Sequence, residues 1–181
     1  MSDDLNGKTY SFDVCAICKS ICCRDANPPL TEERKKIIRN YLLEKKYPTE
    51  SLFVEGDYAH PASDEKGHCI FLDKNTKKCL VHQVKPETCK AGPITFDINR
   101  QTGKLEFYLK KSEICPFAQI IYEDKIRLKE HLEAAKAEIF RLVNNLEAEA
   151  LQAILRIEEP HTFKIFEEPL PENVLNKINF K

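Results

Sequence analysis

The sequence has no tryptophan, a single methionine, five glycines and almost no net charge. So few glycines exclude a collagen-like chain, and a hydrophobic content of 42% excludes intrinsic disorder. The 28 basic and 29 acidic side chains leave a net charge of -1. Because this balance gives no electrostatic basis for binding nucleic acid, we expect no nucleic-acid partner.

Long apolar runs are also missing. No segment approaches the ~18 consecutive apolar residues of a membrane-spanning helix, and the first ten residues, MSDDLNGKTY, lack the apolar stretch of a secretory signal. We therefore expect a cytoplasmic protein with no membrane partner. Cysteines persist as thiols in a reducing cytoplasm, so the eight cysteines indicate metal ligation or redox chemistry rather than static disulfides.

Common catalytic motifs are absent as well. The sequence contains no HExxH helix, no glycine-rich dinucleotide loop and no Ser-His-Asp order typical of hydrolases. Gly7-Lys8-Thr9 resembles the end of a phosphate-binding loop, but the earlier glycine of such a loop would fall at Ser2. The sequence therefore places its function in the cysteines.

Four of the cysteines are clustered in the spacing CxxCxxxCC. On a helix, Cys15, Cys18 and Cys22 would fall within an arc of about 60°, so that three thiols face one point. Such convergence suits zinc, which is enclosed by four ligands, and iron–sulfur clusters, which are commonly held by four thiolates. Cys23 would diverge from its neighbour by about 100° on a helix, so we expect it to serve a second site or to bridge.

Four further cysteines lie downstream, namely Cys69, Cys79, Cys89 and Cys115. We expect Cys89 or Cys115 to complete the first site, while Cys23, Cys69 and Cys79 complete or extend it. A metal bound in this way would attach the N-terminal segment to the downstream hairpins. Folding and metal loading would then be coupled.

Other interpretations of these residues stay open. Single downstream cysteines could be buried core thiols, which are common inside proteins. The pair Cys15-x-x-Cys18 resembles a redox dithiol, which would make the chain a thiol-disulfide oxidoreductase, although the βαβ context of that motif is missing. His68 and His82 lie near downstream cysteines and could complete a mixed site, but solvated loop histidines are the simpler explanation.

Basic side chains fall into two groups. Those in acidic surroundings are expected to form solvated faces. Those next to cysteines would lower thiol pKa values and favour thiolate ligation. The first group comprises Arg34-Lys35-Lys36, Lys45-Lys46, Lys77-Lys78 and Lys110-Lys111, and the second comprises Lys19, Arg24, Lys85 and Lys90.

Hydrophobic periodicity predicts a mixture of helices and short strands. A helix is expected from the N-cap candidate Thr31 up to Pro48, and a short helix at 172–178 within a C-terminal arm that starts at Pro160. Residues 55–69 have the composition of a loop. Two hairpins are expected, one pairing 70–72 with 79–81 around the turn 73–78, and one pairing 94–98 with 105–109 around a turn that contains Gly103.

The clearest periodicity follows Cys115-Pro116. Apolar residues recur there at three- and four-residue steps, and a break is expected near Asn144-Asn145 because one continuous helix would be ~50 Å long. We interpret this stripe as a core face, and a binding surface for a protein partner stays open as the alternative. Its members are Leu128, Leu132, Ala135, Ile139, Leu142, Leu146, Ala150, Ala153 and Ile157.

The order of the cysteine motifs resembles that of a known family. The chain presents Cys15-Ala16-Ile17-Cys18-Lys19-Ser20-Ile21-Cys22-Cys23, then Gly67-His68-Cys69, Cys79, Lys85-Pro86-Glu87-Thr88-Cys89 with Pro93, and Cys115-Pro116. Over residues 12–118 this is similar to the YkgJ-like cysteine-cluster family of zinc- or iron-chelating domains. The resemblance implies that all eight cysteines are metal ligands.

This chain departs from the family at two positions. Lys85 stands where the family usually has arginine, and His82 stands where it has an aromatic residue. Lysine keeps a positive charge that would offset thiolates but loses the planar guanidinium fork. The family also resembles flagellin lysine-N-methylases, which are thought to use an iron–sulfur centre, so an iron-sulfur-dependent protein methyltransferase is a minor alternative.

We therefore predict a single α+β domain over residues 1–181. It combines a cysteine-rich metal-binding region at 12–118, a helical region at 119–158 and an arm at 159–181. The expected function is binding of zinc, iron or an iron–sulfur cluster, with a redox or catalytic role left open.

Overall fold

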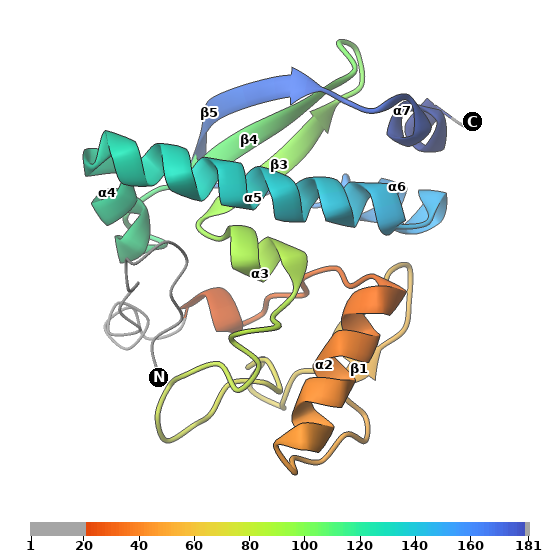
Figure 1. Ribbon diagram of the computed structural model, residues 1–181, viewed down its shortest axis with the longest axis vertical. Coiled ribbons are helices and arrows are strands. Elements are labelled where there is room, and N and C mark those ends of the chain that lie inside the picture. Colours follow the sequence, from red (N-terminus) through yellow and green to blue (C-terminus); the bar gives the residue numbers. More distant parts are fainter. Residues whose placement is uncertain (1–20, 180–181) are drawn as a thin grey trace.

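A computed structural model describes residues 21–179, which contain six α-helices and two antiparallel sheets, so the predicted α+β class is confirmed. Figure 1 shows α5 lengthwise beneath the three-stranded sheet, with α3 and then α2 farther from the sheet. The elements are η1 Ile21–Cys23, α2 Glu32–Glu44, β1 Phe53–Val54, β2 His60–Pro61, α3 Glu87–Ala91, β3 Ile94–Asn99, β4 Lys104–Lys110, α4 Pro116–Glu123, α5 Lys125–Asn145, α6 Ala148–Ile154, β5 Thr162–Pro169 and α7 Glu172–Asn179.

Helix α2 begins where the sequence predicts. The hydroxyl of Thr31 accepts a hydrogen bond of 3.1 Å from the backbone N–H of Arg34, which satisfies one of the free donors at the helix start. Glu32 and Glu33 in the first turn complement the helix dipole. The helix ends at Glu44, before Pro48.

The larger sheet has the strand order β3-β4-β5. The predicted hairpin of β3 and β4 is confirmed, with Ile94 opposite Leu109 and Ile98 opposite Leu105. The C-terminal arm also contains a strand that the sequence analysis did not predict, since residues 162–169 form β5 and pair antiparallel with β4. A terminal proline is tolerated here because β5 is an edge strand, where a missing N–H breaks no central ladder. Helix α7 confirms the short helix expected at 172–178.

The larger hydrophobic core lies between this sheet and α5. Phe107 of β4 is fully buried, and its ring lies 6.4 Å from that of Phe140 and 6.0 Å from that of Phe166. The chain leaves the helix after Asn145, as predicted, and α6 restarts with a shifted phase. The stripe is therefore a core face up to Leu146, but beyond the break Leu151 and Ile154 are buried, while Ile157 is 52% exposed.

A smaller core supports α2. It consists of Leu30, Ile38, Leu42, Leu52, Phe71 and Val81. The hairpin predicted at 70–81 is wrong as a strand pair, because Leu72 and Cys79 form a single isolated bridge around a tight turn. The carboxylate of Asp73 accepts hydrogen bonds from the backbone N–H groups of Asn75 and Thr76, which closes the loop without a ladder. The short sheet is instead built by β1 and β2, and β2 lies within the segment predicted as a loop.

Two basic residues of α2 are buried, contrary to the sequence prediction. Arg34 and Lys35 were expected on a solvated face, yet both are buried on α2. The ammonium of Lys35 pairs with Glu32 and, at 2.8 Å, with Glu55, and these contacts raise its pKa against the opposing effect of burial. Partners on other segments therefore make the burial of these charges possible.

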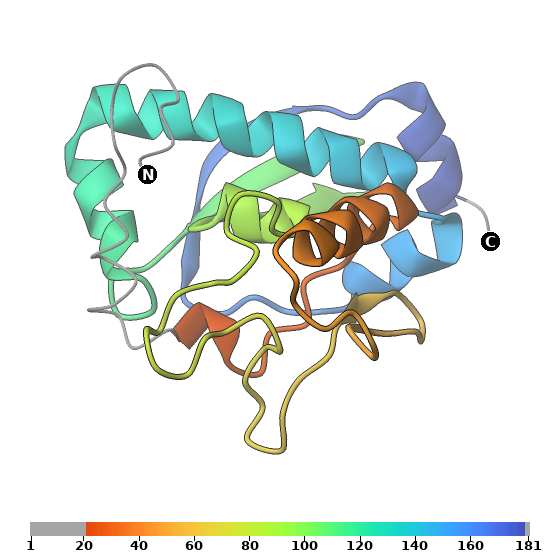
Figure 2. The same cartoon turned by 60° about the horizontal axis from the view of Figure 1, so that its bottom comes forward.

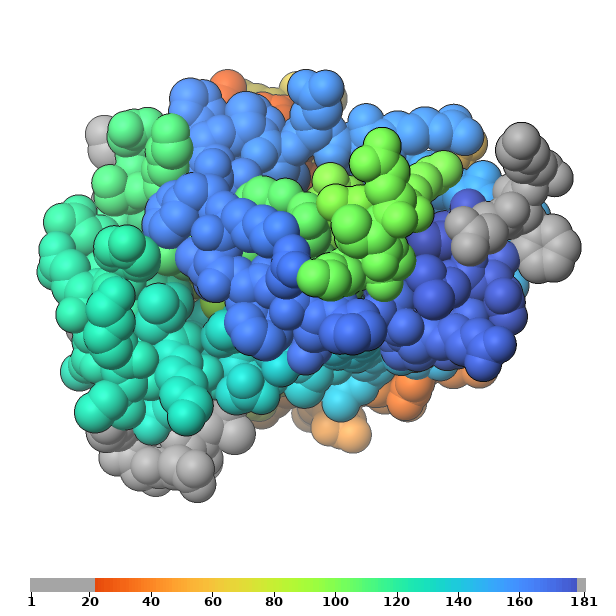
Figure 3. All heavy atoms as spheres, turned by 90° about the horizontal axis from the view of Figure 1, so that it is seen from above, coloured from red at the N-terminus to blue at the C-terminus, as the bar shows by residue number. Residues whose placement is uncertain are grey.

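The outer face of the sheet carries polar side chains, and Figure 3 shows β5 and the turn between β3 and β4 at the surface on this side of the molecule. On it Glu106 accepts hydrogen bonds from Tyr108 and Asn99 and pairs with Lys164 at 2.8 Å. None of the helices within residues 21–179 combines the length and apolarity needed to cross a lipid bilayer.

Candidate metal centre

Backbone pairing joins the first cysteine segment to the second. The N–H of Cys69 donates to the carbonyl of Cys23 at 2.8 Å, and the N–H of Asp25 donates to the carbonyl of Gly67 at 2.8 Å. Gly67 has a φ of +78°, in the left-handed region that L side chains rarely adopt. Glycine is therefore favoured where the loop turns to meet the segment after η1.

The third and fourth segments approach the same region. The N–H of Leu72 donates to the carbonyl of Cys69 at 2.9 Å, and Leu72 forms the bridge with Cys79. Both cysteines pack against the smaller core. Cys89 lies on α3, and Figures 1 and 2 both show η1 next to the loop that leads into this helix.

Cys22 and Cys23 interact directly. The Cys23 thiol hydrogen-bonds to the Cys22 sulfur, which lowers the pKa of the exposed Cys22 to about 6 and raises that of Cys23. On a regular helix these neighbouring side chains would diverge by about 100°. The two residues instead end a short 3-10 helix, and their sulfurs lie side by side.

The other thiols of this region are held neutral by burial. Burial raises the pKa of Cys69 and of Cys89, and raises that of Cys79 to about 11. Each of the three is also close enough to Cys22 for a charge there to raise its pKa further. The positive charge of Lys85 acts in the opposite direction on Cys22, Cys79 and Cys89, as its place in the motif predicts.

Of the eight predicted ligands, backbone contacts join the segments that carry Cys23, Cys69 and Cys79. Cys22 and Cys89 are near enough to these segments to share electrostatic effects with them. No disulfide links these five cysteines. Cys15 and Cys18 lie outside the described residues. Cys115 is the N-cap of α4 and packs against the larger core.

The donor set suits zinc or iron in its chemistry, because thiolates are preferred ligands of both metals. Within residues 21–179, however, no three cysteine, histidine or carboxylate side chains already enclose a common point. Any ion bound by the described thiols would therefore have to draw them closer together or use Cys15 and Cys18 as well.

The histidines and basic residues near the cysteines have distinct positions. The ring of His68 faces Asp64 at 3.5 Å, while the backbone N–H of His82 donates to the carbonyl of Cys79. Arg24 pairs with Asp25, and Lys90 pairs with Glu138. Lys110, which the sequence analysis assigned to a solvated face, acts on Cys22 and lowers its pKa.

A buried ion network fixes the helix that bears Cys89, and the sequence analysis missed it. Arg34 of α2 donates at 3.0 Å to Glu87 of α3 and at 3.0 Å to Glu138 of α5. The side chains of Arg34 and Glu87 are only 4% and 1% exposed. The one local signal was that Glu87 lies inside the motif Lys85-Pro86-Glu87-Thr88-Cys89, two residues before the cysteine.

A family model matches the part of the sequence that carries the cysteines. Residues 14–116 match the family model described as "CxxCxxCC: Putative zinc- or iron-chelating domain". The uncharacterized protein MJ0661 of Methanocaldococcus jannaschii is 36% identical over 107 residues, which cover 56% of this chain and 52% of that protein. The chain thus spans about half the length of this curated relative. No solved structure matches this chain. Because the family model covers more than half of the sequence, the chain belongs to the CxxCxxCC family of zinc- or iron-chelating domains.

Proposed function

We propose that this chain binds zinc or iron, as an ion or as an iron–sulfur cluster, through thiolates of its eight cysteines. Cys22, Cys23, Cys69, Cys79 and Cys89 would supply the described part of the ligand set, and Cys15, Cys18 and Cys115 would complete it. The supporting observations are the family match over residues 14–116 and the backbone hydrogen bond and bridge that join the segments of Cys23, Cys69 and Cys79.

Lys85 has a defined part in this proposal. Thiolates bound to a metal carry negative charge, and a nearby ammonium offsets that charge. Burial of Cys79 and Cys89 keeps them protonated without metal, so loading the site would release protons. When bound, zinc with four sulfurs would supply a closed structural site, whereas an iron–sulfur cluster would supply redox chemistry.

We also propose a reducing compartment such as the cytoplasm and one domain over residues 1–181. The described cysteines are all free, and such thiols persist where disulfides do not form. Helix α3 packs against α5 and is ion-paired to α2, which supports treating both cores as one unit.

Metal analysis tests the proposal. The full chain, purified without oxygen, is expected to contain zinc or iron in stoichiometric amounts by elemental analysis. Acid-labile sulfide and broad visible absorption would identify an iron–sulfur cluster, whereas zinc absorbs no visible light. Metal-free protein from anaerobic preparation would refute the proposal.

Variants assign the ligands. We expect Cys89→Ser and Cys22→Ser to lower the metal content markedly, while Thr88→Ser, which changes a neighbour of Cys89 without removing a sulfur, retains it. A chelator is expected to expose thiols to a colorimetric thiol reagent and to lower the melting temperature. Full metal content in both cysteine variants would contradict the ligand assignment.

A further inference from the structure

The segments that carry Cys89 and Cys115 meet at one end of the larger sheet. The N–H of Lys110, the last residue of β4, donates to the carbonyl of Pro93 at 3.1 Å, directly before β3. Cys89 lies on α3, shortly before Pro93, and Cys115 is the N-cap of α4, shortly after Lys110. The sheet therefore brings the starting points of two predicted ligand segments together.

A histidine of α5 closes the C-terminal end of α3. Nε2 of His131 lies 3.0 Å from the carbonyl oxygen of Ala91 and 3.1 Å from that of Gly92. Because a carbonyl oxygen can only accept, Nε2 carries the proton and shares it between the two oxygens. The last carbonyls of a helix have no partner within the helix, so a donor from outside is needed there. His131 thus fixes the turn that directly follows Cys89.

The same ring contacts the helix that begins at Cys115. The rings of His131 and Phe117 meet edge to face, with their centroids 5.7 Å apart, which is a preferred arrangement of aromatic pairs. Phe117 belongs to the first turn of α4, whose N-cap is Cys115. Burial lowers the pKa of His131, and the positive charge of Lys85 acts in the same direction. A neutral imidazole therefore touches both ligand segments at once.

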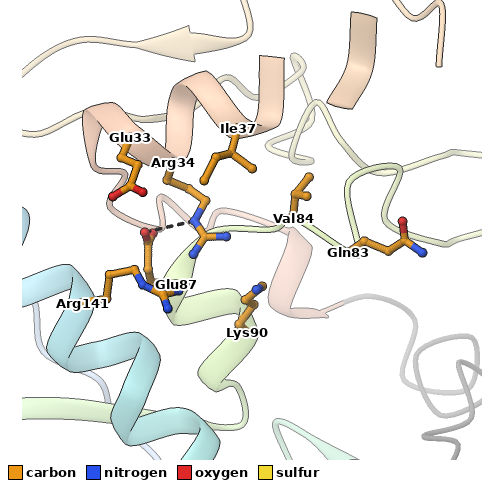
Figure 4. Close-up of a pocket in the computed structure, with 8 residues that line it drawn as sticks. All are labelled: Glu33, Arg34, Ile37, Gln83, Val84, Glu87, Lys90 and Arg141. Atoms are coloured by element: carbon orange, nitrogen blue, oxygen red, sulfur yellow. Dashed lines mark hydrogen bonds and ion pairs between the residues drawn. The ribbon is translucent and has the colours of Figure 1, made fainter. Parts of the chain in front are cut away.

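Ion pairs hold the remainder of α3. Arg34 of α2 pairs with Glu87, and Lys90 pairs with Glu138 of α5. Figure 4 shows the Arg34–Glu87 pair between α2 and α3, with Lys90 farther along α3. His131 and Glu138 are about two turns apart on α5, so both face α3. The ion pairs thus restrain the body of the helix, and His131 restrains its end.

We propose that His131 is a positioning residue that holds Cys89 and Cys115 in place for one shared metal centre. This inference rests on the proposed metal function. The sequence leaves open which of the two cysteines completes the first site, and the proposal assigns both of them to it. His131 is not a ligand here, because its Nε2–H is used by the two carbonyls. It acts on Cys89 through the backbone and on Cys115 through Phe117.

Three variants of the full chain test this role by zinc titration in competition with a chromophoric chelator. His131→Phe keeps an aromatic ring but removes the donor, and we expect it to weaken zinc binding about tenfold or more, as loss of a partner behind the metal ligands commonly does. His131→Gln retains a side-chain N–H and should recover most of that loss. Leu142→Ala is the control, because Leu142 is fully buried about three turns farther along α5. It should lower the melting temperature without changing the zinc affinity.

Cobalt(II) in place of zinc tests the shared centre. The charge-transfer absorption per bound cobalt rises with the number of thiolate ligands, so Cys89→Ser and Cys115→Ser should each lower it for the same cobalt ion. We expect His131→Phe to lower it as well, and His131→Gln to stay close to the parent chain.

The outcomes separate this inference from the proposed function. The inference is overturned if His131→Phe binds zinc as tightly as a metal-binding parent chain, if Leu142→Ala loses as much affinity as His131→Phe, or if Cys115→Ser leaves the cobalt spectrum unchanged. In each of these cases the proposed metal function stands. A parent chain that binds neither zinc nor cobalt refutes the proposed function and this inference with it.

Discussion

The clearest energetic prediction concerns Arg34, whose guanidinium joins α2 to α3 and α5. Replacing it with methionine would leave the Glu87 carboxylate, which is 1% exposed, with the Thr31 hydroxyl as its remaining described partner. Removal of one member of a buried ion pair costs about 3–5 kcal/mol, because the other charge stays buried without compensation. This is a large part of the roughly 5–15 kcal/mol that stabilises a typical domain.

Urea unfolding followed by circular dichroism measures this cost directly. For a chain of this size the loss corresponds to a fall in melting temperature of about 6–20 °C. Arg39→Met is the control on the same helix, because Arg39 is exposed and its guanidinium lies 5.5 Å from the centre of the Phe53 ring. It should cost about 1 kcal/mol or less.

A double variant separates loss of charge pairing from loss of packing. Arg34→Met combined with Glu87→Met removes both buried charges and retains side-chain volume, so it should be more stable than Arg34→Met alone. Glu138 keeps Lys90 and Arg141 as partners in this variant. The reasoning is refuted if Arg34→Met unfolds within about 1 kcal/mol of the parent chain, or if the two single losses simply add.

Three further predictions concern the sheet, the core and the cysteine loop. The hydrogen bond from Lys164 lowers the pKa of Glu106, so the contribution of Glu106 to folding stability is present above its unfolded pKa and is lost as the pH falls. Glu106→Gln should therefore lower the melting temperature at pH 7 but progressively less below about pH 4. A difference in melting temperature that stays constant with pH would contradict this. Ile139→Ala should cost about 2–5 kcal/mol in urea unfolding because Ile139 is fully buried, whereas Ile126→Ala, on a side chain that is 66% exposed, should change stability by less than about 0.5 kcal/mol. Gly67→Ala should reduce the metal retained after gel filtration, because alanine is strained at the φ of +78° that this position adopts, and Gly56→Ala, whose nearest neighbour would be 4.0 Å away, should not.

Local sequence signals predicted the elements that depend on local interactions. The hydroxyl of Thr31 caps the first turn of the helix that follows it in the sequence. The turn at Gly103 is likewise predicted from neighbouring residues, because glycine adopts the positive φ found there. The break after Asn145 could also be predicted from the sequence, because one continuous helix would be unusually long. Strand β5 was missed because its pairing partner, β4, lies far away in the sequence, so no local signal reveals the pairing.

The candidate site shows the same division. Cysteine spacing identified the residue type and the chemistry of the site. It could not show that Cys23 and Cys69 share a backbone hydrogen bond, or that the sulfurs of Cys22 and Cys23 lie together. Glu87 was missed because a buried carboxylate is possible only with its partner on α2, and nothing in the adjacent sequence reveals that partner.

Helix α3 has a mechanical consequence for the whole chain. Ala91 at its end belongs to the larger core, while Val84 just before it packs against the smaller core. Cys89 lies between these two attachments. Restraint of its sulfur would therefore stiffen the junction of the two cores, so that a helix of five residues governs whether they melt together or separately.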